Sequence, residues 1–373
     1  MIHIIGPRRA KADALTLVGD TVQLLHSIQE SMIFNRILRR LLVLVSIVAL
    51  AAGCGHLYQT RATAHDLKMH PAPGRMIDVN GLKYHLNCMG AGSPTVILEA
   101  GLGESSLSWY PVQSEIAKTT QVCAYDRAGL GWSEGGDQAT TPEEVAINLR
   151  TLLKNAEVES PFILVGHSRG GIYARNFYHQ FPTEVEGMVL VDSVHENGAS
   201  REWPYAKWGY RKQKLQIAIA KPLSQIGVIR ALGWANADKY PSPLPPDILQ
   251  AKTAVQNRTA TTHAVVNEIT VMRQSLDPAT PPPASLKNLP LTVLTSGKGT
   301  SVELARQKAI NSNQSVENAI AIAQLEDEMQ QELAALSSNS KHIVVENSGH
   351  FIMYDQPALV INAIGELVGA VRQ

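Results

Sequence analysis

A serine with a glycine two residues to either side is the part of this chain best suited to covalent chemistry. Ser168 stands within Gly166–Gly170 (GHSRG), with the apolar run Phe162–Val165 before it and a helical pattern over Ile172–Gln180 after it. A serine on a sharp turn between a strand and a helix exposes its hydroxyl, and the helix N-terminus stabilises negative charge that develops beside it. We predict that Ser168 is the nucleophile of an acyl transfer; the alternative is an incidental serine in a glycine-rich turn.

His350 is the best candidate for the base that a serine nucleophile needs. It follows the strand-like run His342–Val345 and precedes a helix predicted over 358–371. The chain has twelve histidines, and any one of them taken alone is more simply a surface histidine. The position after a strand, far downstream of Ser168, favours His350 as general base.

A second glycine-rich turn could stabilise the negative charge of a tetrahedral intermediate. The strand-like run Thr95–Glu99 ends in Ala100–Gly103. Two fixed backbone N–H groups pointing at one oxygen form an oxyanion hole. We assign these groups to Leu102 and to Arg169, the residue after the nucleophile.

From about Arg75 to Gln373 the chain resembles the α/β-hydrolase superfamily, in its serine-nucleophile esterase, lipase and peptidase-like branch. Four motifs carry this resemblance, in the family's order and spacing: 99–103 (EAGLG), 125–129 (YDRAG), 166–170 (GHSRG) and 348–351 (SGHF). The resemblance implies an α/β fold with an eight-stranded, mostly parallel sheet and helices on both faces. It also implies a helical cap inserted after strand 6.

The acid of the catalytic triad departs from the family pattern. The family usually carries an aspartate three residues after Gly297, where this sequence has Thr300. Some branches carry the acid after the sixth strand, and Asp192 ends the apolar run there. We predict Asp192 as the acid, with Glu303 as the alternative; Asp192 could instead only cap a turn.

Strand-like and helical runs alternate along most of the chain, which favours a mainly parallel sheet covered on both faces. The hydrolase core is predicted over 75–192 and 291–373, and the cap over 193–290, where the alternation stops. A helix around 316–336 carries Glu326 and is interpreted as a solvated face. Strands are predicted at 75–79, 82–88, 95–99, 121–126, 162–166, 188–192, 291–295 and 342–346.

The N-terminal region reads as a targeting segment. Leu41–Gly55 is apolar and free of charge, and Arg36, Arg39 and Arg40 precede it. This order is typical of a signal peptide or signal anchor, here 32–60, that leaves its basic end in the cytoplasm. We expect a membrane-anchored or exported protein with the catalytic domain on the extracytoplasmic side; the alternative is a buried core helix. Residues 1–31 are interpreted as a doubtful extension, and 61–74 as a linker.

Composition and cysteines narrow the remaining possibilities. The chain has 33 Lys+Arg and 33 Asp+Glu, so we expect no nucleic-acid partner. It has no zinc-type cysteine spacing, Walker loop or dinucleotide fingerprint, so we expect no metal and no cofactor. The family's sheet makes the second and fourth strands neighbours, which makes a disulfide between Cys88 and Cys123 possible after export. Two buried free thiols are the alternative.

These observations favour a serine hydrolase that cleaves an ester or related acyl bond of a small molecule. Ser168 would form the acyl-enzyme, and His350 would act as base and then acid. Dehalogenase and epoxide hydrolase branches carry an aspartate where Ser168 stands, so their chemistry is not expected. The alternatives are an aminopeptidase-type hydrolase and a non-catalytic hydrolase-fold protein for binding or signalling.

Overall fold

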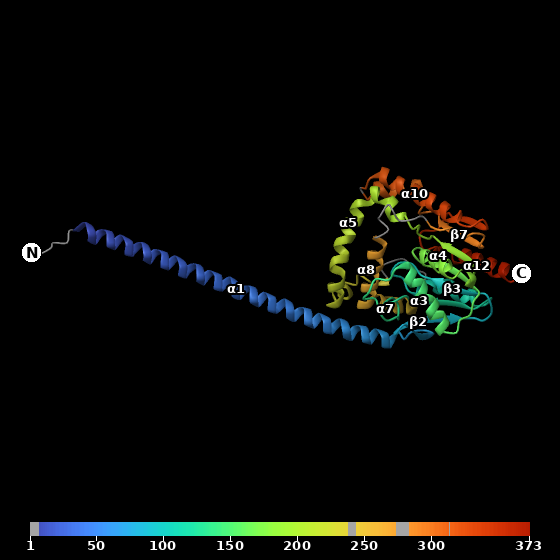
Figure 1. Ribbon diagram of the computed structural model, residues 1–373, viewed down its shortest axis with the longest axis horizontal. Helices are drawn as coiled ribbons and strands as arrows, with labels where there is room; N and C mark the ends of the chain where they lie inside the picture. Colours follow the sequence, from blue (N-terminus) through green and yellow to red (C-terminus); the bar gives the residue numbers. More distant parts are fainter. Residues whose placement is uncertain (1–6, 238–243, 274–282, 313) are drawn as a thin grey trace, which may run out of the picture. The chain divides into compact units, whose positions relative to one another are not determined.

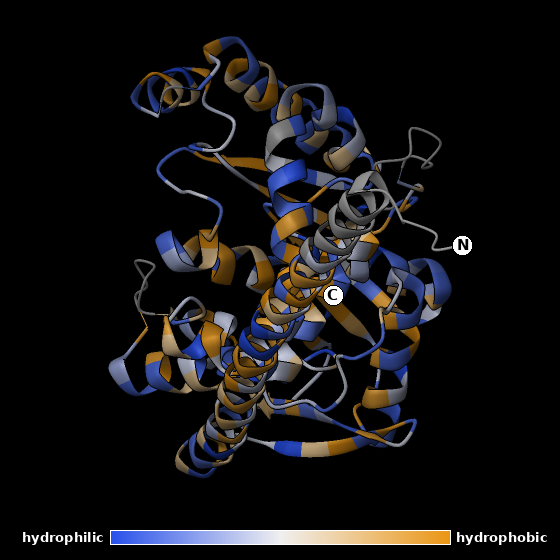
Figure 2. Ribbon diagram, turned by 90° about the vertical axis from the view of Figure 1, so that its left-hand side faces the viewer, coloured by the Kyte–Doolittle hydropathy of each residue, from blue (hydrophilic) through white to orange (hydrophobic). Residues whose placement is uncertain are grey.

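The computed structural model describes residues 7–237, 244–273, 283–312 and 314–373. The chain divides into two units, Met1–Tyr58 and Gln59–Gln373. The first unit consists of most of helix α1 (Pro7–Met69), and hydrophobic residues run along much of this helix (Figure 2). Among the described helices, α1 alone is long and apolar enough to cross a membrane, and its apolar window is wholly exposed. It is therefore not a core helix of the described chain.

The predicted linker over 61–74 is mostly helical instead. Helix α1 continues to Met69, since no proline or glycine interrupts the chain between Gly55 and Pro71. The last part of α1 belongs to the second unit, where Gln59 is buried. Arg230 donates hydrogen bonds to Gln59 Oε1 (3.0 Å) and Thr63 Oγ1 (3.2 Å) and pairs with Asp66. The C-terminal part of α1 therefore packs against the second unit and is not a flexible linker.

The second unit is built on one eight-stranded sheet, as predicted. Its strand order is β1-β2-β4-β3-β5-β6-β7-β8; β2 pairs antiparallel with both β1 and β4, and the remaining pairs are parallel. Parallel strands place their carboxyl ends at one edge, where such sheets carry their sites. The strands span Arg75–Val79, Leu82–Met89, Thr95–Glu99, Val122–Tyr125, Phe162–His167, Val185–Val191, Leu291–Ser296 and Ser340–Val345.

Both faces of the sheet are covered, so its central strands are apolar on both sides. In β5, Phe162 and Leu164 pack into one hydrophobic cluster, while Ile163 and Val165 pack into another on the opposite face. The helices and 3₁₀ turns around the sheet are η1 (Ser106–Trp109), α2 (Tyr110–Ile116), α3 (Pro142–Asn155), α4 (Gly170–Gln180), η2 (Pro182–Glu184), α9 (Val302–Asn311), α10 (Val316–Ala334), α11 (Ile352–Asp355) and α12 (Pro357–Val371).

A disulfide joins Cys88 of β2 to Cys123 of β4. The two residues lie directly opposite each other in the antiparallel register of these strands. The pairing of β2 with β4, rather than with β3, is what brings these two thiols together.

A helical insertion follows β6, as predicted for the cap. It contains α5 (Gly198–Gln225), α6 (Val228–Ala231), α7 (Pro246–Gln256) and α8 (Thr259–Met272). Helix α5 meets α10 at one end (Figure 1), where Arg201 pairs with Glu328 and Glu332. Towards its other end, Lys221 donates a hydrogen bond to Asn267 of α8. Side-chain contacts near both ends therefore fix the position of α5 within the cap.

Candidate active site

Ser168 occupies a tight turn between β5 and α4. Its backbone is left-handed, with φ of 53°, which is uncommon for a residue other than glycine. A Cβ at Gly166 would lie 2.6 Å from Gly171 Cα, and one at Gly170 would lie 2.4 Å from the Glu99 carbonyl oxygen. The glycines are therefore required for this close approach of strand and helix. Strand β6 braces the turn, since Ser168 N donates a hydrogen bond to Val191 O.

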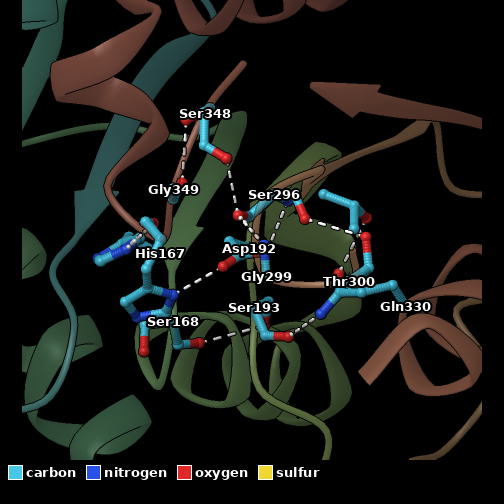
Figure 3. A network of polar contacts seen from close by, with 12 residues as sticks. His167, Ser168, Asp192, Ser193, Ser296, Gly299, Thr300, Gln330, Ser348 and Gly349 are labelled. Carbon is cyan, nitrogen blue, oxygen red and sulfur yellow. Dashed lines mark hydrogen bonds and ion pairs between the residues drawn. The ribbon is translucent and has the colours of Figure 1, made fainter. Parts of the chain in front are cut away.

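Asp192 lies immediately after β6 and faces His350. Its Oδ2 is 2.7 Å from His350 Nδ1. Its Oδ1 accepts a hydrogen bond of 2.8 Å from Ser296 N (Figure 3). The Asp192 backbone is also left-handed, with φ of 41°. Glu303, the alternative acid, lies on α9 with an exposed side chain and contacts Gln307 and Arg306 of its own helix. The structure thus brings Asp192, and not Glu303, to the predicted base.

His167, the residue before the nucleophile, connects His350 to the turn. His167 Nε2 lies 2.9 Å from the His350 carbonyl oxygen, and the two rings have centroids 4.7 Å apart. Burial lowers the pKa of His167 to about 3, and His350 acts in the same direction. A neutral His167 that donates through Nε2 cannot compete with His350 for the serine proton. Sequence reasoning did not single out His167, although its place beside Ser168 was a usable signal.

The predicted oxyanion turn lies against Ser168. A Cβ at Gly101 would be 3.3 Å from Ser168 Cβ. Arg127 donates hydrogen bonds of 2.7 Å to the carbonyl oxygens of Ala100 and Gly101. On the other side, the N–H of Gly103 donates a hydrogen bond of 2.8 Å to Glu268 Oε2.

Two backbone amides next to Ser168 are left without a partner. In the part of the chain that the structure describes, neither Leu102 N nor Arg169 N donates a hydrogen bond. Arg169 is buried and Leu102 is partly buried, and an amide without a protein partner is available to a ligand oxygen. Both predicted oxyanion donors are therefore free for that role.

Comparison with known proteins identifies the fold family. Residues 96–363 match the model of the alpha/beta hydrolase family. The chain belongs to the α/β-hydrolase family. Among curated proteins it is similar to "Uncharacterized protein YqjL" of Bacillus subtilis, with 25% identity over 77% of this chain and 88% of that protein. It also shares 34% identity with an "Uncharacterized vacuolar membrane protein" of Saccharomyces cerevisiae, over 28% of this chain and 17% of that protein.

Solved structures share the hydrolase fold at low sequence identity. An esterase from Thermogutta terrifontis aligns with a TM-score of 0.54 and 19% identity over 80% of this chain and 97% of its own. A putative lipase from Acinetobacter baumannii has a TM-score of 0.57 and 20% identity, covering 84% and 96%. The Cif epoxide hydrolase from Acinetobacter nosocomialis has a TM-score of 0.60 and 16% identity, covering 84% and 96%. These likenesses concern the fold and leave the reaction to the site itself.

The charges behind the oxyanion turn of this hydrolase form a buried chain. Arg127 pairs with Glu99 (2.7 Å) and with Glu268 of cap helix α8 (2.8 Å). Burial raises the pKa of Glu99 to about 7 against the opposing attraction of Arg127. Although burial disfavours its charge, Glu268 and Glu99 hold the pKa of Arg127 well above its ordinary value. Sequence reasoning placed Arg127 in a family motif without a role and missed Glu268, which carries no local signal.

Glu326 is another residue that sequence reasoning did not assign to the site. The helix that carries it, α10, was interpreted as a solvated face, yet this side chain is partly buried and lines a cavity of about 690 Å³ with Lys298 and Lys308. Burial raises the pKa of Glu326 to about 7, and the charges of Glu202 and Asp192 act in the same direction. The interaction with Asp192 places Glu326 in the electrostatic environment of the candidate triad.

A second His–Asp pair in this hydrolase is structural. His85 Nδ1 lies 2.8 Å from Asp126 Oδ2, and both side chains are fully buried. The other nitrogen of His85 contacts the Pro73 carbonyl oxygen, and the backbone N–H groups of Ser106 and Trp132 donate to Asp126. Every polar atom of this pair already has a protein partner, so the pair has no free atom for a substrate. Among the described side chains, no group of three His, Cys, Asp or Glu is placed to hold a metal ion.

Two cavities adjoin the site beneath α5. One, of about 390 Å³, is lined by Arg169, Ile172 and Glu202. The other, of about 360 Å³, touches Gly103 at the oxyanion turn. Its remaining lining is largely apolar and comes from the cap, and it includes Ile217, Ala220, Trp234, Val265 and Ile269.

Proposed function

We propose that this α/β hydrolase is a serine hydrolase that cleaves an ester of a small acyl-bearing molecule. The observation that carries the proposal is the 2.7 Å contact of Asp192 Oδ2 with His350 Nδ1. His350 also contacts His167, the residue that directly precedes Ser168. A carboxylate at Nδ1 fixes the tautomer in which Nε2 is free to accept a proton. Solved relatives with esterase and putative lipase in their names agree with this choice.

Each residue has a distinct role in the proposed reaction. Ser168 Oγ attacks the acyl carbon while its proton passes to His350, and the amides of Leu102 and Arg169 bind the oxyanion. His350 then gives that proton to the leaving alcohol, which departs from the acyl-enzyme. Water attacks next, its proton goes to His350, and collapse of the second intermediate returns the proton to Ser168.

The apolar part of α1 serves in this proposal as a membrane anchor. Arg36, Arg39 and Arg40 precede the apolar run, so the basic end stays in the cytoplasm and the catalytic unit lies on the other side. Fractionation of cells, followed by protease treatment of intact and opened compartments, tests both points. Recovery of the full-length chain in the soluble cytosolic fraction would refute the anchor.

Labelling with a fluorophosphonate probe tests the nucleophile. We expect Ser168→Ala to abolish labelling and ester hydrolysis, because loss of a triad nucleophile costs about a million-fold in a well-studied protease. Ser106→Ala is the matched control, since Ser106 lies beside the structural His85–Asp126 pair. The control should label normally; unlabelled wild-type protein would instead favour a non-catalytic binding role.

A further inference from the structure

The outer surface of the cap exposes a group of large apolar side chains. Leu215 and Ile219 of α5 are 67% and 46% exposed, and Leu232 and Trp234, just after α6, are 52% and 55% exposed. We call these four residues the cap patch. Helices α5 and α6 are in contact, and large apolar side chains exposed on adjoining elements commonly mark a binding surface.

Helix α5 carries apolar side chains on two faces, whereas an ordinary surface helix carries them on one. Gln213, Ile217 and Ala220 share one face and line the cavity that reaches the oxyanion turn. Leu215 and Ile219, four residues apart, share another face and are exposed. The first face is accounted for by the cavity, whereas solvent alone does not account for the second.

The chain enters the catalytic unit at the cap, through the residues of α1 that belong to this unit. Gln59 is the first residue of that unit, and its Nε2 donates a hydrogen bond of 2.8 Å to Asn257 O in the cap. Its Oε1 accepts a hydrogen bond from Arg230, which precedes Leu232 by two residues and Trp234 by four. The chain therefore leaves its apolar segment at the part of the cap that carries Leu232 and Trp234.

We propose that the cap patch rests on the surface of the lipid bilayer that α1 crosses, and that the cavity beside it receives the acyl chain of a membrane lipid ester. This proposal rests on the proposed function of Ser168 and on the proposed anchor. It names the substrate class of that site: esters of long acyl chains drawn from the membrane.

The chemistry of the cap patch fits a bilayer surface. Tryptophan is favoured at the boundary between headgroups and acyl chains, and exposed aliphatic side chains insert there. Lys212 and Lys214 are exposed on α5 next to Leu215, where long basic side chains reach lipid phosphates. Chain continuity with an apolar helix selects a bilayer over a protein partner as the occupant.

Trp234 belongs to both the cap patch and the cavity next to the predicted oxyanion turn. Its side chain is exposed and also lines the cavity of about 360 Å³ that Gly103 lines as well. An acyl chain in this cavity would contact Trp234, Ile217 and Val265, and the same cavity is lined by Gly103 of the predicted oxyanion turn. The apolar lining makes transfer from a bilayer favourable at little desolvation cost.

The first experiment compares two substrates with full-length protein in vesicles of phosphatidylcholine and phosphatidylglycerol. Leu215→Ser/Ile219→Ser should hydrolyse dissolved p-nitrophenyl butyrate within about two-fold of wild type, and a fluorescent long-chain glyceride ester in the vesicles about ten-fold more slowly. The matched control is Ile147→Ser/Val344→Ser, which removes apolar side chains of 47% and 46% exposure outside the cap. Equal rates of the cap variant and wild type on both substrates would overturn the proposal.

A second measurement is independent of catalysis. An environment-sensitive NBD label at Leu215→Cys, in a Cys54→Ser background, should shift to the blue on addition of the same vesicles and be quenched by brominated lipid. A label at Val344→Cys should not respond. A label at 215 that stays in water with vesicles present, or that is buried without them against a second copy, refutes bilayer docking. If Leu215→Ser/Ile219→Ser hydrolyses neither substrate, the NBD measurement decides whether the cap patch docks on the bilayer. If the wild type hydrolyses neither substrate, the proposed function fails, while the NBD measurement still tests docking.

Discussion

Glu268 of cap helix α8 pairs with Arg127 of the core at 2.8 Å, and the two residues hold opposite sides of the oxyanion turn. Arg127 takes the carbonyl oxygens of Ala100 and Gly101, while Glu268 takes the N–H of Gly103. Of the amides in this turn, that of Gly103 is occupied by Glu268, whereas the amide of Leu102 donates to no other group among the described residues. The cap therefore contributes to the geometry of the turn as well as covering the site.

Glu268→Ala should lower kcat and leave KM nearly unchanged, because the turn stabilises charge that develops only in the transition state. Loss of a whole oxyanion donor costs about 10²–10³-fold, so a loosened turn should cost roughly ten-fold. Steady-state kinetics on a soluble ester measures this. Lys221→Ala is the control, since it removes a different contact of α8, the hydrogen bond to Asn267. A rise in KM at constant kcat would assign Glu268 to substrate binding instead.

Asp192→Asn should reduce kcat by up to about ten-thousand-fold, as expected when a triad histidine loses the carboxylate that orients it. Glu303→Gln should be nearly silent, because Glu303 contacts only its own helix among the described residues. Both changes are close to isosteric, so packing is barely altered. Kinetics of the two variants, with melting temperatures as a check on folding, settle the acid. Similar losses in both variants would contradict the assignment.

Glu326 should make stability depend on pH. Its folded pKa of about 7 lies above its ordinary value of 4.5, so the folded state holds a proton that the unfolded state releases. The stability of the wild type should therefore fall as pH rises from 4.5 to 7 through this group and stay low above 7. Glu326→Gln should melt higher than wild type at pH 8.5 and at the same temperature at pH 4. A difference that is equal at both pH values would rule out titration of Glu326 as its cause.

Removal of the Cys88–Cys123 disulfide should destabilise the catalytic unit. The bond closes a loop with a sequence separation of 35. Loop-closure entropy predicts a loss of about 3–4 kcal/mol in the free energy of unfolding for Cys88→Ala/Cys123→Ala. Denaturant unfolding measures the loss, with Cys54→Ser as the control because Cys54 is free and exposed. An unchanged midpoint in the double variant, or an intact mass that shows two free thiols, would contradict the bond.

Local signals were enough to find Ser168 and His350. Ser168 directly follows the apolar strand β5, and its turn glycines and following helix are encoded within a few residues of it; His350 lies in the loop after β8. The strands were also predicted from local sequence, because an apolar run between turn residues indicates a strand without knowledge of its neighbours in the sheet. The helical character of the cap also followed from local pattern.

The choice between Asp192 and Glu303 depended on contacts between distant parts of the chain. Asp192 reaches His350 because β6 and β7 are adjacent and Ser296 N holds its other oxygen. The contact of Arg127 with Glu268 joins residues 141 positions apart. The pKa of Glu326 is raised only because packing buries this side chain near other carboxylates. Sequence motifs specify residue types and local backbone, whereas distances between side chains on different elements follow from sheet register and cap packing. For that reason the chain itself pointed to Ser168 and His350, and only the tertiary structure showed that Asp192 contacts His350 and that Arg127 and Glu268 hold the turn at 100–103.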